Sequence, residues 1–419
     1  MTPARRWIVA CVALGLILRL IFGLFYWTGK PLTHDEREYL ALARSLVRGD
    51  GFSYPADEPS PGTGQQFGRA PGYPLFLALL AVKEPVDVVP VRVKVAQAVV
   101  GTLGVWLIAA IALGAAGPRA GVTAAALAAV HPPLVFMPAY ALSETLYSMV
   151  VLLLAWAWGR WDPVDDRRHL GTLLAAILTA VAILVRPSTL FFVLLAILWI
   201  ATRQRPPSRT LALQRAAIFA AVTTACVAPW TIRNALVYHR FIPVASEGGV
   251  TFWTGNHPLA RGDGDLAANL PIKKAELEFR GRHPGVAPED LEPLYYQDAF
   301  AWIREHPGSW AALVLRKAFY TIVPIGPSYT LHSPKYYAAT AGAYLALLVP
   351  AIPGAWLLMR RGNPPVALWL MAASTVIAGL IFFPQERFRI PVIDPALIVA
   401  ASGVAAFWGH ERTRRRSDV

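Results

Sequence analysis

Residues 7–27, WIVACVALGLILRLIFGLFYW, form an apolar stretch in which Arg19 is the single charged residue. About 20 consecutive apolar residues suffice for a helix to cross the hydrocarbon core of a bilayer. The stretch is too long for the apolar region of a signal peptide, and it lacks a small-x-small cleavage site. We therefore predict that it is a retained transmembrane helix.

The composition of the whole chain is that of a membrane protein. Of the 419 residues, 55% are apolar and only 16% are charged, and the mean hydropathy is +0.44. A soluble domain has far more charged and fewer apolar residues. The formal net charge of +13 would suggest nucleic-acid binding in a soluble protein, but here the arginines gather in short loops between apolar runs. This distribution indicates orientation in a membrane, and we expect no nucleic-acid partner.

Further apolar runs predict nine more spans, which makes about ten transmembrane helices in an all-α polytopic protein. These runs cover 90–114, 119–137, 141–160, 169–185, 187–203, 212–230, 336–358, 364–383 and 390–409. Two other runs do not fit a span, because 71–82 is short and 309–325 contains Arg316 and Lys317. A charge at the bilayer centre costs at least ~2.5 kcal/mol. We expect these two runs to form interfacial or re-entrant helices.

The positive charges fix the orientation of the spans, because cytoplasmic loops collect Lys and Arg. With ten spans, every strongly basic loop falls on one side together with both termini. The residues concerned are Arg5, Arg6, Arg119, Arg160, Arg167, Arg168, Arg203, Arg205, Arg209, Arg215, Arg360, Arg361 and the tail Arg412–Arg416. Counting 71–82 and 309–325 as spans would move several of these loops outside. We therefore place both termini in the cytoplasm of a multi-pass protein of the plasma (inner) membrane.

Two long segments, 28–89 and 231–335, then lie on the external or periplasmic side, and we look for chemistry there. Thr33 and Glu36 have the spacing of a capping box at the start of an amphipathic helix that ends at Gly49. Residues 289–305 predict a second external helix. These features divide the chain into a seven-span module with the first external loop (1–230), a second external loop (231–335) and three C-terminal spans with a basic tail (336–419).

Carboxylates and arginines gather beside the external ends of the predicted spans. The candidate site residues are Asp35, Glu36, Arg69, Glu144, Arg186, Arg233, Arg387 and Arg389, with Glu386 beside them. An ionisable group at the membrane edge indicates function by default. The planar fork of arginine suits a phosphate, and a carboxylate suits proton removal from a hydroxyl.

Each candidate also has a structural interpretation. Asp35 and Glu36 suit the first turn of a helix, where an acid caps the backbone and answers the helix dipole. Arg186 and Arg233 lie at span ends, where an arginine often anchors a helix at the interface. Glu144 gains nothing from such anchoring, and Arg387 with Arg389 on the less basic side runs against the charge bias. The last three therefore indicate binding more strongly.

Eight short pieces, in order along the chain, resemble the GT-C superfamily of membrane glycosyltransferases, family 39 type, which includes protein O-mannosyltransferases and aminoarabinose transferases. The pieces are Asp35-Glu36 with Tyr39 and Ala43, Arg69-Ala-Pro-Gly-Tyr73-Pro, Ser143-Glu144-Thr-Leu-Tyr147, Arg186-Pro187, Pro229-Trp-Thr-Ile-Arg233-Asn234, Gly255-Asn256, Glu305-His-Pro-Gly308 and Arg387-Phe-Arg389-Ile-Pro391. The resemblance implies a GT-C fold in which Asp35 occupies the place of the family's invariant external-loop aspartate.

The resemblance also implies an inverting transfer of a hexosyl or pentosyl group from a polyprenyl phosphate. We expect Asp35, with Glu36 beside it, to be catalytic, and the other candidates, together with Tyr73 from the matching pieces, to bind the donor or acceptor. The expected partners are a polyprenyl-phosphate-linked sugar, membrane lipid and a glycan, lipid or protein acceptor. No residue set requires a metal, although the resemblance allows a divalent cation. The alternatives are a polytopic transporter or lipid flippase, and an oligosaccharide polymerase or ligase that uses a lipid diphosphate.

Overall fold

The structure is a computed structural model that describes residues 2–54, 68–82, 85–163, 169–202, 209–264, 269–326 and 333–417. Arg167, Arg168, Arg203 and Arg205 lie outside these ranges, and the tail side chains beyond residue 406 are likewise not described. The described residues form helices and no named strand; a single isolated bridge joins Pro31 and Val88. The predicted all-α architecture is therefore confirmed.

Each of the ten apolar runs lies in a helix or in a pair of adjoining helices. These are α1 (Pro3–Ile21), α4 (Val91–Ala116), α5 (Pro118–Val130) with α6 (Pro132–Phe136), α7 (Glu144–Arg160), α8 (Leu170–Val185), α9 (Leu190–Thr202), α10 (Arg209–Tyr238), α15 (Pro334–Arg360), α16 (Val366–Ile381) and α18 (Ile393–Ser417). By length and composition, four of the described helices suffice to cross a membrane alone, namely α1 with the following π-turn, α4, α10 and α15. The pair α5–α6 makes a fifth if counted as one span.

The bend between α5 and α6 measures 63° and has a local cause. Pro132 and Pro133 follow His131, and a proline inside a helix removes a hydrogen bond and clashes with the preceding turn. The chain therefore turns at His131, whose side chain is 4% exposed. After the bend and α6, Met137–Ala139 form a short 3₁₀ turn that leads toward α7.

The helices of the bundle pack closely because small residues line their contacts. On α5 the buried face carries Ala120, Ala124 and Ala128, and α1, α4 and α18 pack against this helix. At Gly354 in α15, a Cβ would collide with the backbone of Ala400 in α18. Small side chains let helix backbones approach one another, which is the usual basis of helix association in lipid.

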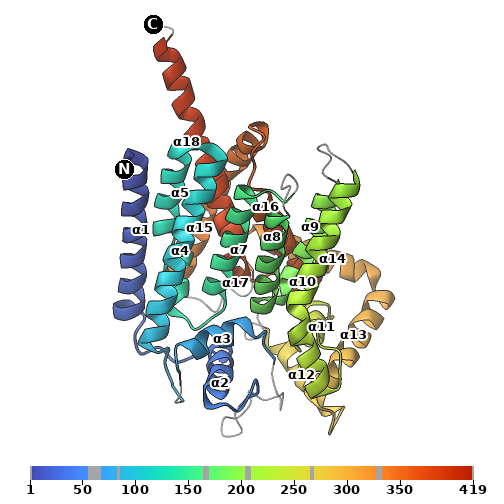
Figure 1. The fold of residues 1–419 in the computed structure, drawn as a ribbon. Helices are drawn as coiled ribbons and strands as arrows, with labels where there is room; N and C mark the ends of the chain where they lie inside the picture. The colour runs from blue at the N-terminus through green and yellow to red at the C-terminus, as the bar shows by residue number, and fades with distance from the viewer. Residues whose placement is uncertain are drawn as a thin grey trace.

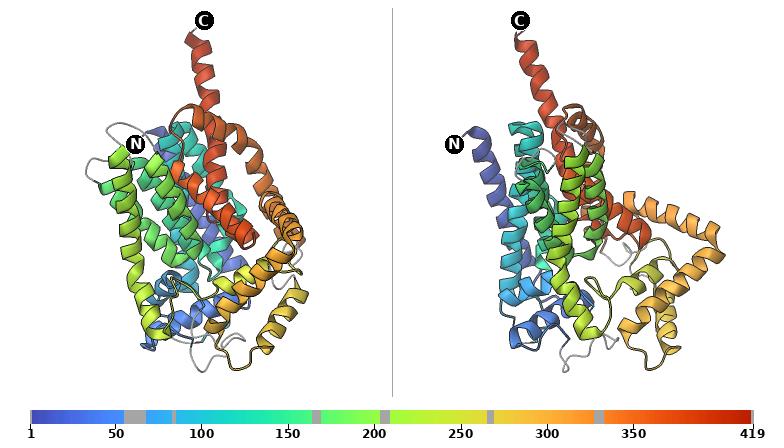
Figure 2. Two further views of the ribbon diagram at one scale, coloured as in Figure 1. Left: turned by 90° about the vertical axis from the view of Figure 1, so that its right-hand side faces the viewer. Right: turned by 45° about the vertical axis from the view of Figure 1, so that its right-hand side comes forward.

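The ends of the molecule differ in character. The beginning of α1 and the end of α18 lie at one end (Figure 1), whereas five shorter helices lie at the other (Figure 2). The shorter helices are α2 (His34–Arg48), α3 (Gly72–Leu79), α11 (Gly248–Gly255), α12 (Leu270–Gly281) and α13 (Pro288–Glu305). This arrangement agrees with the predicted placement of both termini on the side opposite the two long loops.

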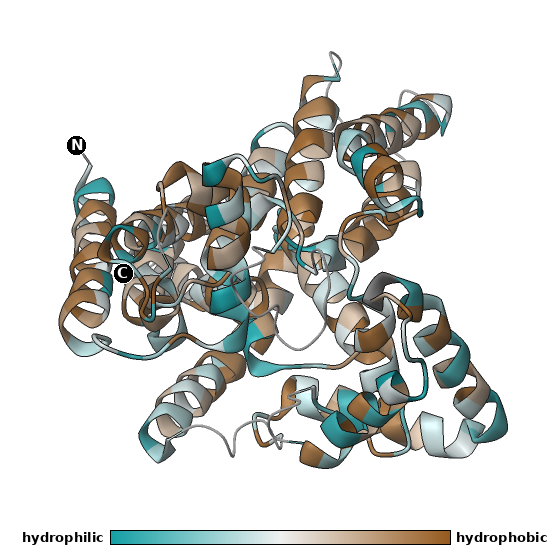
Figure 3. Cartoon of the chain, turned by 90° about the horizontal axis from the view of Figure 1, so that it is seen from below, coloured by the Kyte–Doolittle hydropathy of each residue, from teal (hydrophilic) through white to brown (hydrophobic). Residues whose placement is uncertain are grey.

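Hydropathy separates the bundle from this second end. Seen from that end, the helix beside the N label is largely hydrophobic, whereas hydrophilic residues are interspersed along the outlying helices at the lower right (Figure 3). Helices α11–α13 have a small core of their own that includes Phe252, Trp253, Phe279 and Tyr295.

Both runs predicted to be interfacial form short helices. The first is α3, and the second is α14 (Pro307–Ile322); neither is among the described helices that suffice to cross a membrane. Leu315, Phe319 and Ile322 are exposed on α14, whereas Lys317 is fully buried. The ammonium of Lys317 donates to the carbonyl oxygens of Leu380 (3.1 Å) and Ile381 at the end of α16, which ties the two helices together.

Candidate active site

Asp35 lies in the first turn of α2, and the start of that helix is set by a capping box. The hydroxyl of Thr33 accepts from the Glu36 N–H, and the Glu36 carboxylate accepts from the Thr33 N–H at 2.8 Å. The helix ends at Gly49, whose φ of 88° is readily adopted by a residue without a side chain. The predicted amphipathic helix is therefore confirmed, including both of its ends.

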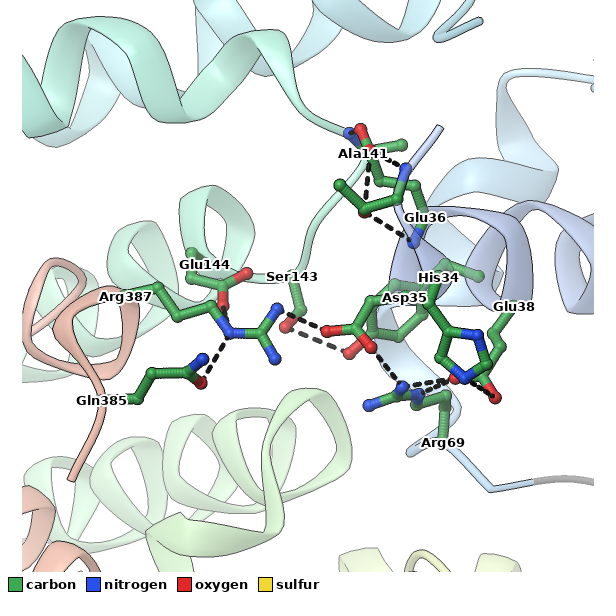
Figure 4. A network of polar contacts seen from close by, with 12 residues as sticks. His34, Asp35, Glu36, Glu38, Arg69, Ala141, Ser143, Glu144, Gln385 and Arg387 are labelled. Atoms are coloured by element: carbon green, nitrogen blue, oxygen red, sulfur yellow. Dashed lines mark hydrogen bonds and ion pairs between the residues drawn. The ribbon is translucent and has the colours of Figure 1, made fainter. Parts of the chain in front are cut away.

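The Asp35 carboxylate lies between two arginines from distant parts of the chain (Figure 4). Oδ1 accepts from Arg69 at 2.6 Å, and Oδ2 pairs with a terminal guanidinium nitrogen of Arg387. Burial by itself raises the pKa of Asp35, but the positive charges of Arg387 and Arg69 outweigh it and hold that pKa well below its ordinary value. Asp35 is therefore charged in this state, and both of its oxygens have partners.

Arg69 is held by three carboxylates. Besides Asp35, its Nε donates to Glu38 at 2.6 Å, and a terminal nitrogen lies 3.4 Å from Glu247. The guanidinium also faces the ring of Tyr39 at 5.4 Å. Although burial lowers the pKa of Arg69, Asp35, Glu247 and Glu38 together raise it well above its ordinary value. These contacts fix Arg69 in one orientation.

A glycine brings Arg69 to the end of the bundle. Three residues after Arg69, Gly72 packs so closely on the end of α8 that a Cβ would lie 2.9 Å from the Leu184 carbonyl oxygen. Arg186 follows α8 directly. The close approach of Gly72 to Leu184 therefore places Arg69 and Arg186 at the same end of the molecule. The sequence alone does not reveal this approach.

A second pair of arginines shares Glu144 and one aromatic ring. The Glu144 carboxylate lies 3.2 Å from Arg186 and 4.0 Å from Arg387. Both guanidinium groups face the ring of Phe388, at 4.8 Å for Arg186 and 5.3 Å for Arg387. Two like charges are held here by a carboxylate and by cation–π contacts, which is an arrangement suited to a multiply charged anion.

We call this set the Asp35 cluster. Its members are Asp35, Glu38, Arg69, Glu144, Arg186, Glu247 and Arg387. Five of the residues expected from the sequence are thus brought together, namely Asp35, Arg69, Glu144, Arg186 and Arg387. The five positions come from segments as far apart as α2 and the four-residue helix α17 (Glu386–Arg389), which lies between α16 and α18.

Glu36 has a different place from its neighbour. Its side chain points away from the arginines toward the segment that leads into α7, where Oε1 accepts from the Ala141 N–H at 2.9 Å (Figure 4). Glu36 is 2% exposed, and its other oxygen is occupied by Thr33. These contacts dock α2 on the start of α7 and so position Asp35 relative to Glu144.

Three other expected site residues lie apart from the Asp35 cluster. Arg233 is surrounded by the rings of Phe52, Trp230 and Tyr238, and it donates to the Tyr238 hydroxyl at 3.2 Å. Tyr73 is fully buried, and its hydroxyl donates to Gln97 at 2.9 Å. Arg389 pairs with Asp394 at 3.0 Å. The structure does not bring these three residues together with Asp35.

Two acids of the Asp35 cluster were missed in the sequence. Glu38 lies one helical turn after Asp35, and this i,i+3 spacing on one helix face is a signal that was available. Glu247 precedes α11, and nothing in its local sequence indicates a contact with Arg69. Burial raises the pKa of Glu247 to about 7, against the opposing effect of the Arg69 charge.

The donor set of the cluster does not fit a divalent metal. A divalent-metal site needs several oxygen or nitrogen ligands that face one ion. The carboxylate oxygens of Asp35 already face two guanidinium groups, which occupy the positions that a cation would take. Within the described part of the chain, no three His, Cys, Asp or Glu side chains are placed to share an ion. We therefore derive no step through a metal.

Neither a protein-family model nor a curated protein matches this sequence. The fold does match solved structures. The oligosaccharyltransferase AglB from Archaeoglobus fulgidus, in complex with an inhibitory peptide and a dolichol-phosphate, aligns with 99% of this chain at 15% identity and a TM-score of 0.54. Its apo form gives a TM-score of 0.56 at 16% identity. This chain spans about half of that protein, since 52% of AglB is covered in either comparison.

A second solved structure is ArnT from Cupriavidus metallidurans bound to undecaprenyl phosphate. The alignment covers 96% of this chain and 77% of ArnT, at 16% identity and a TM-score of 0.43. The sequence identities are low throughout, so the likeness is one of fold, and the AglB comparisons carry it. The chain therefore shares its fold with the matched oligosaccharyltransferase AglB, in agreement with the fold expected from the sequence.

Proposed function

We propose that this protein is an inverting glycosyltransferase that moves a sugar from a polyprenyl phosphate to an acceptor hydroxyl at the outer face of the membrane. The observation that carries the proposal is the placement of the Asp35 carboxylate between Arg69 and Arg387, at the end of the bundle opposite both termini. An acid able to accept a proton and cations able to hold a phosphate are thereby adjacent. Such a transfer needs both a group that takes the acceptor proton and groups that hold the departing phosphate.

The donor phosphate would be held by the exposed sides of Arg387 and Arg186. Their side chains are 29% and 17% exposed, and both face the ring of Phe388. Guanidinium groups donate paired charge-assisted hydrogen bonds to phosphate oxygens. They also stabilise the negative charge that grows on the phosphate as the sugar leaves. Of the five arginines expected to bind the donor, Arg233 and Arg389 are engaged elsewhere.

The transfer would then proceed in one displacement. The acceptor hydroxyl gives its proton to Asp35 while its oxygen bonds to the anomeric carbon. The bond from that carbon to the phosphate oxygen breaks, and the electron pair stays on the phosphate, which leaves as a polyprenyl phosphate. The anomeric configuration is inverted because the acceptor attacks from the side opposite the leaving group. Glu144 orients Arg186 and Arg387, and Glu36 keeps α2 in place.

The fold likeness supports the same class of donor. AglB was solved with a dolichol-phosphate and with an inhibitory peptide, and it is called an oligosaccharyltransferase. We extend the lipid-linked donor to this chain, with a hexosyl or pentosyl group as cargo and a glycan, lipid or protein as acceptor. The plasma (inner) membrane, with the Asp35 cluster facing the periplasm or exterior, is the proposed location.

The test is turnover of purified full-length protein in lipid nanodiscs with a panel of polyprenyl-phosphate sugars. Release of polyprenyl phosphate is measured with and without candidate acceptors, and Asp35→Asn serves as the inactive control. We expect release with at least one monophosphate donor and none in the control. Turnover of lipid-diphosphate donors alone would place the protein with the polymerases and ligases. Failure to bind any lipid phosphate would reject the proposal.

A further inference from the structure

In this structure Asp35 is poorly suited to act as a base. A general base needs a free lone pair that points at the proton it removes. Both oxygens of Asp35 instead accept from guanidinium groups, and the carboxylate is only 15% exposed. Charge-assisted hydrogen bonds to an anion stabilise it and so reduce its tendency to take a proton. One of the two arginines must move before Asp35 can act as a general base.

The two arginines are held very differently. Arg69 has three carboxylate partners and is 18% exposed, so that leaving Asp35 would also disturb its place between Glu38 and Glu247. Arg387 is 29% exposed and has Asp35 as its close carboxylate, with Glu144 at 4.0 Å and the Gln385 side chain at 2.9 Å. Arg387 is therefore the partner that a competing anion can draw away.

A second position for Arg387 lies close by. Its guanidinium already faces the ring of Phe388, which it shares with Arg186. A phosphate held by Arg186 would attract Arg387 toward that side without moving the backbone of α17. Arg389, two residues farther on, pairs with Asp394 in α18 and so anchors α17 while the side chain of Arg387 turns.

We propose that Arg387 is a gating residue, which keeps Asp35 masked until the donor phosphate binds and then turns from the carboxylate to the phosphate. This inference rests on the proposed function and adds an order of events, in which the donor binds first and the base becomes available second. In the resting state Asp35 is charged but weakly basic. Loss of one arginine partner raises the pKa of an aspartate by about one to three units.

Other charged groups around Asp35 set the size of that change. The titratable and charged side chains that face it are His34 and Glu38 on α2, Arg69 before α3, Glu144 at the start of α7, Glu247 before α11 and Arg387 on α17. When Arg387 turns away, the remaining acids oppose the charge of Arg69. The pKa of Asp35 therefore moves upward and toward the range of a working base.

The experiment measures protonation of Asp35 directly. A water-soluble carbodiimide with an amine labels carboxyl groups through their protonated form, and peptide mass spectrometry reports the labelling of Asp35 as a function of pH. The probe is farnesyl phosphate, with farnesol as the control that lacks the anion, and binding is followed separately by calorimetry. We expect the labelling midpoint of Asp35 to rise by about one to three pH units with farnesyl phosphate and to stay unchanged with farnesol.

Variants separate the gate from other effects. Arg387→Gln should raise the midpoint to a similar extent without any ligand, and farnesyl phosphate should then add little. Arg186→Gln is the matched control, because Arg186 contacts Glu144, Tyr147 and Phe388 but not Asp35; it should leave the ligand-free midpoint unchanged.

Three results would overturn the gate. The first is binding of farnesyl phosphate without a change at Asp35, which leaves the proposed function intact. The second is an unchanged midpoint in Arg387→Gln. The third is a full further shift with ligand in that variant, since the phosphate charge alone would then explain the effect. If farnesyl phosphate does not bind at all, both the gate and the proposed function are wrong.

Discussion

Arg387 and Arg389 lie two residues apart in the sequence but belong to two charged clusters with different surroundings. Arg387 belongs to the Asp35 cluster, whereas Arg389 pairs with Asp394. The Asp394 carboxylate also accepts a 2.9 Å hydrogen bond from the ring of His131, at the bend between α5 and α6. Asp394 is fully buried, and His131 and Arg389 are 4% and 6% exposed. We call the second set the Arg389 network. The Asp35 cluster instead keeps a solvent-facing side.

The difference teaches how the same residue types acquire different roles. The Arg389 network joins α5, α17 and α18, and the Arg389 guanidinium also faces the ring of Tyr344 in α15, so that these buried charges hold helices together. The Asp35 cluster has more than one carboxylate for some arginines and partly exposed guanidinium groups. Buried charges that pair with one another stabilise the fold. Charged side chains that remain partly exposed can exchange their protein partner for a ligand.

The largest expected effect is loss of transfer in Asp35→Asn. Asparagine also caps a helix well, so α2 should remain folded. It cannot accept a proton as a carboxylate does, and we expect transfer to fall by roughly 10²–10⁴-fold. The rate is measured with the donor found in the panel, and farnesyl phosphate binding serves as the control for folding. Near-normal transfer would reject Asp35 and make Glu144 the next acid to test; Glu36→Gln should have a milder effect.

The next prediction concerns stability and tests whether the buried Arg389 network holds the helices together. Asp394→Ala removes the carboxylate that lies 3.0 Å from the buried Arg389, and breaking a buried ion pair in this way costs about 3–5 kcal/mol. The free energy of unfolding in detergent should fall accordingly. Asp35→Ala is the matched comparison and should cost clearly less, since the cluster around Asp35 is more accessible. Equal losses would remove the distinction between the two clusters.

Arginine-to-lysine variants compare the two neighbouring arginines of α17. Lysine keeps the charge but loses the two parallel donors. We expect Arg387→Lys to weaken farnesyl phosphate binding by about tenfold while expression holds. Arg389→Lys should leave binding near the wild-type value and lower thermal stability instead. Calorimetry and thermal unfolding decide this, and equal affinities in all three proteins would return Arg387 to an anchoring role.

The smallest effect is expected at the cap of α2. Thr33→Ala removes the hydroxyl that accepts from the Glu36 N–H, and loss of an N-cap of this kind costs about 0.5–2 kcal/mol. Thermal unfolding should show this loss, and Thr33→Ser should restore most of it. A large loss of transfer with an unchanged unfolding temperature would show that the cap has a direct part in the reaction.

Much of the fold follows from the sequence because its signals are local. Apolar length predicts the helices, and all ten runs lie in helices of the structure. Charge bias predicts that both termini lie at one end, with the long loops at the other. The capping box predicts where α2 begins, which requires only the backbone and two side chains three residues apart. The helix predicted over 289–305 is found as Pro288–Glu305.

The candidate site follows less completely, because contacts between distant segments decide it. The sequence points to Asp35, Arg69 and Arg387 but gives no distances between them. Asp35 and Glu36 are equivalent in the sequence, yet a helix turns successive residues by about 100°. One acid therefore faces the arginines and the other docks on Ala141.

What the sequence determined by itself is the membrane character, the helical class, the placement of both termini at one end and the types of residue at the other. These properties depend on the free energy of transfer of each segment into lipid and on backbone capping, which neighbouring residues set. What only the tertiary structure decided is which charges meet: Glu247 reaches Arg69, Arg389 turns into the bundle, and Arg387 reaches Asp35. Such meetings depend on close packing between helices that are far apart in the chain, as at Gly72 against Leu184.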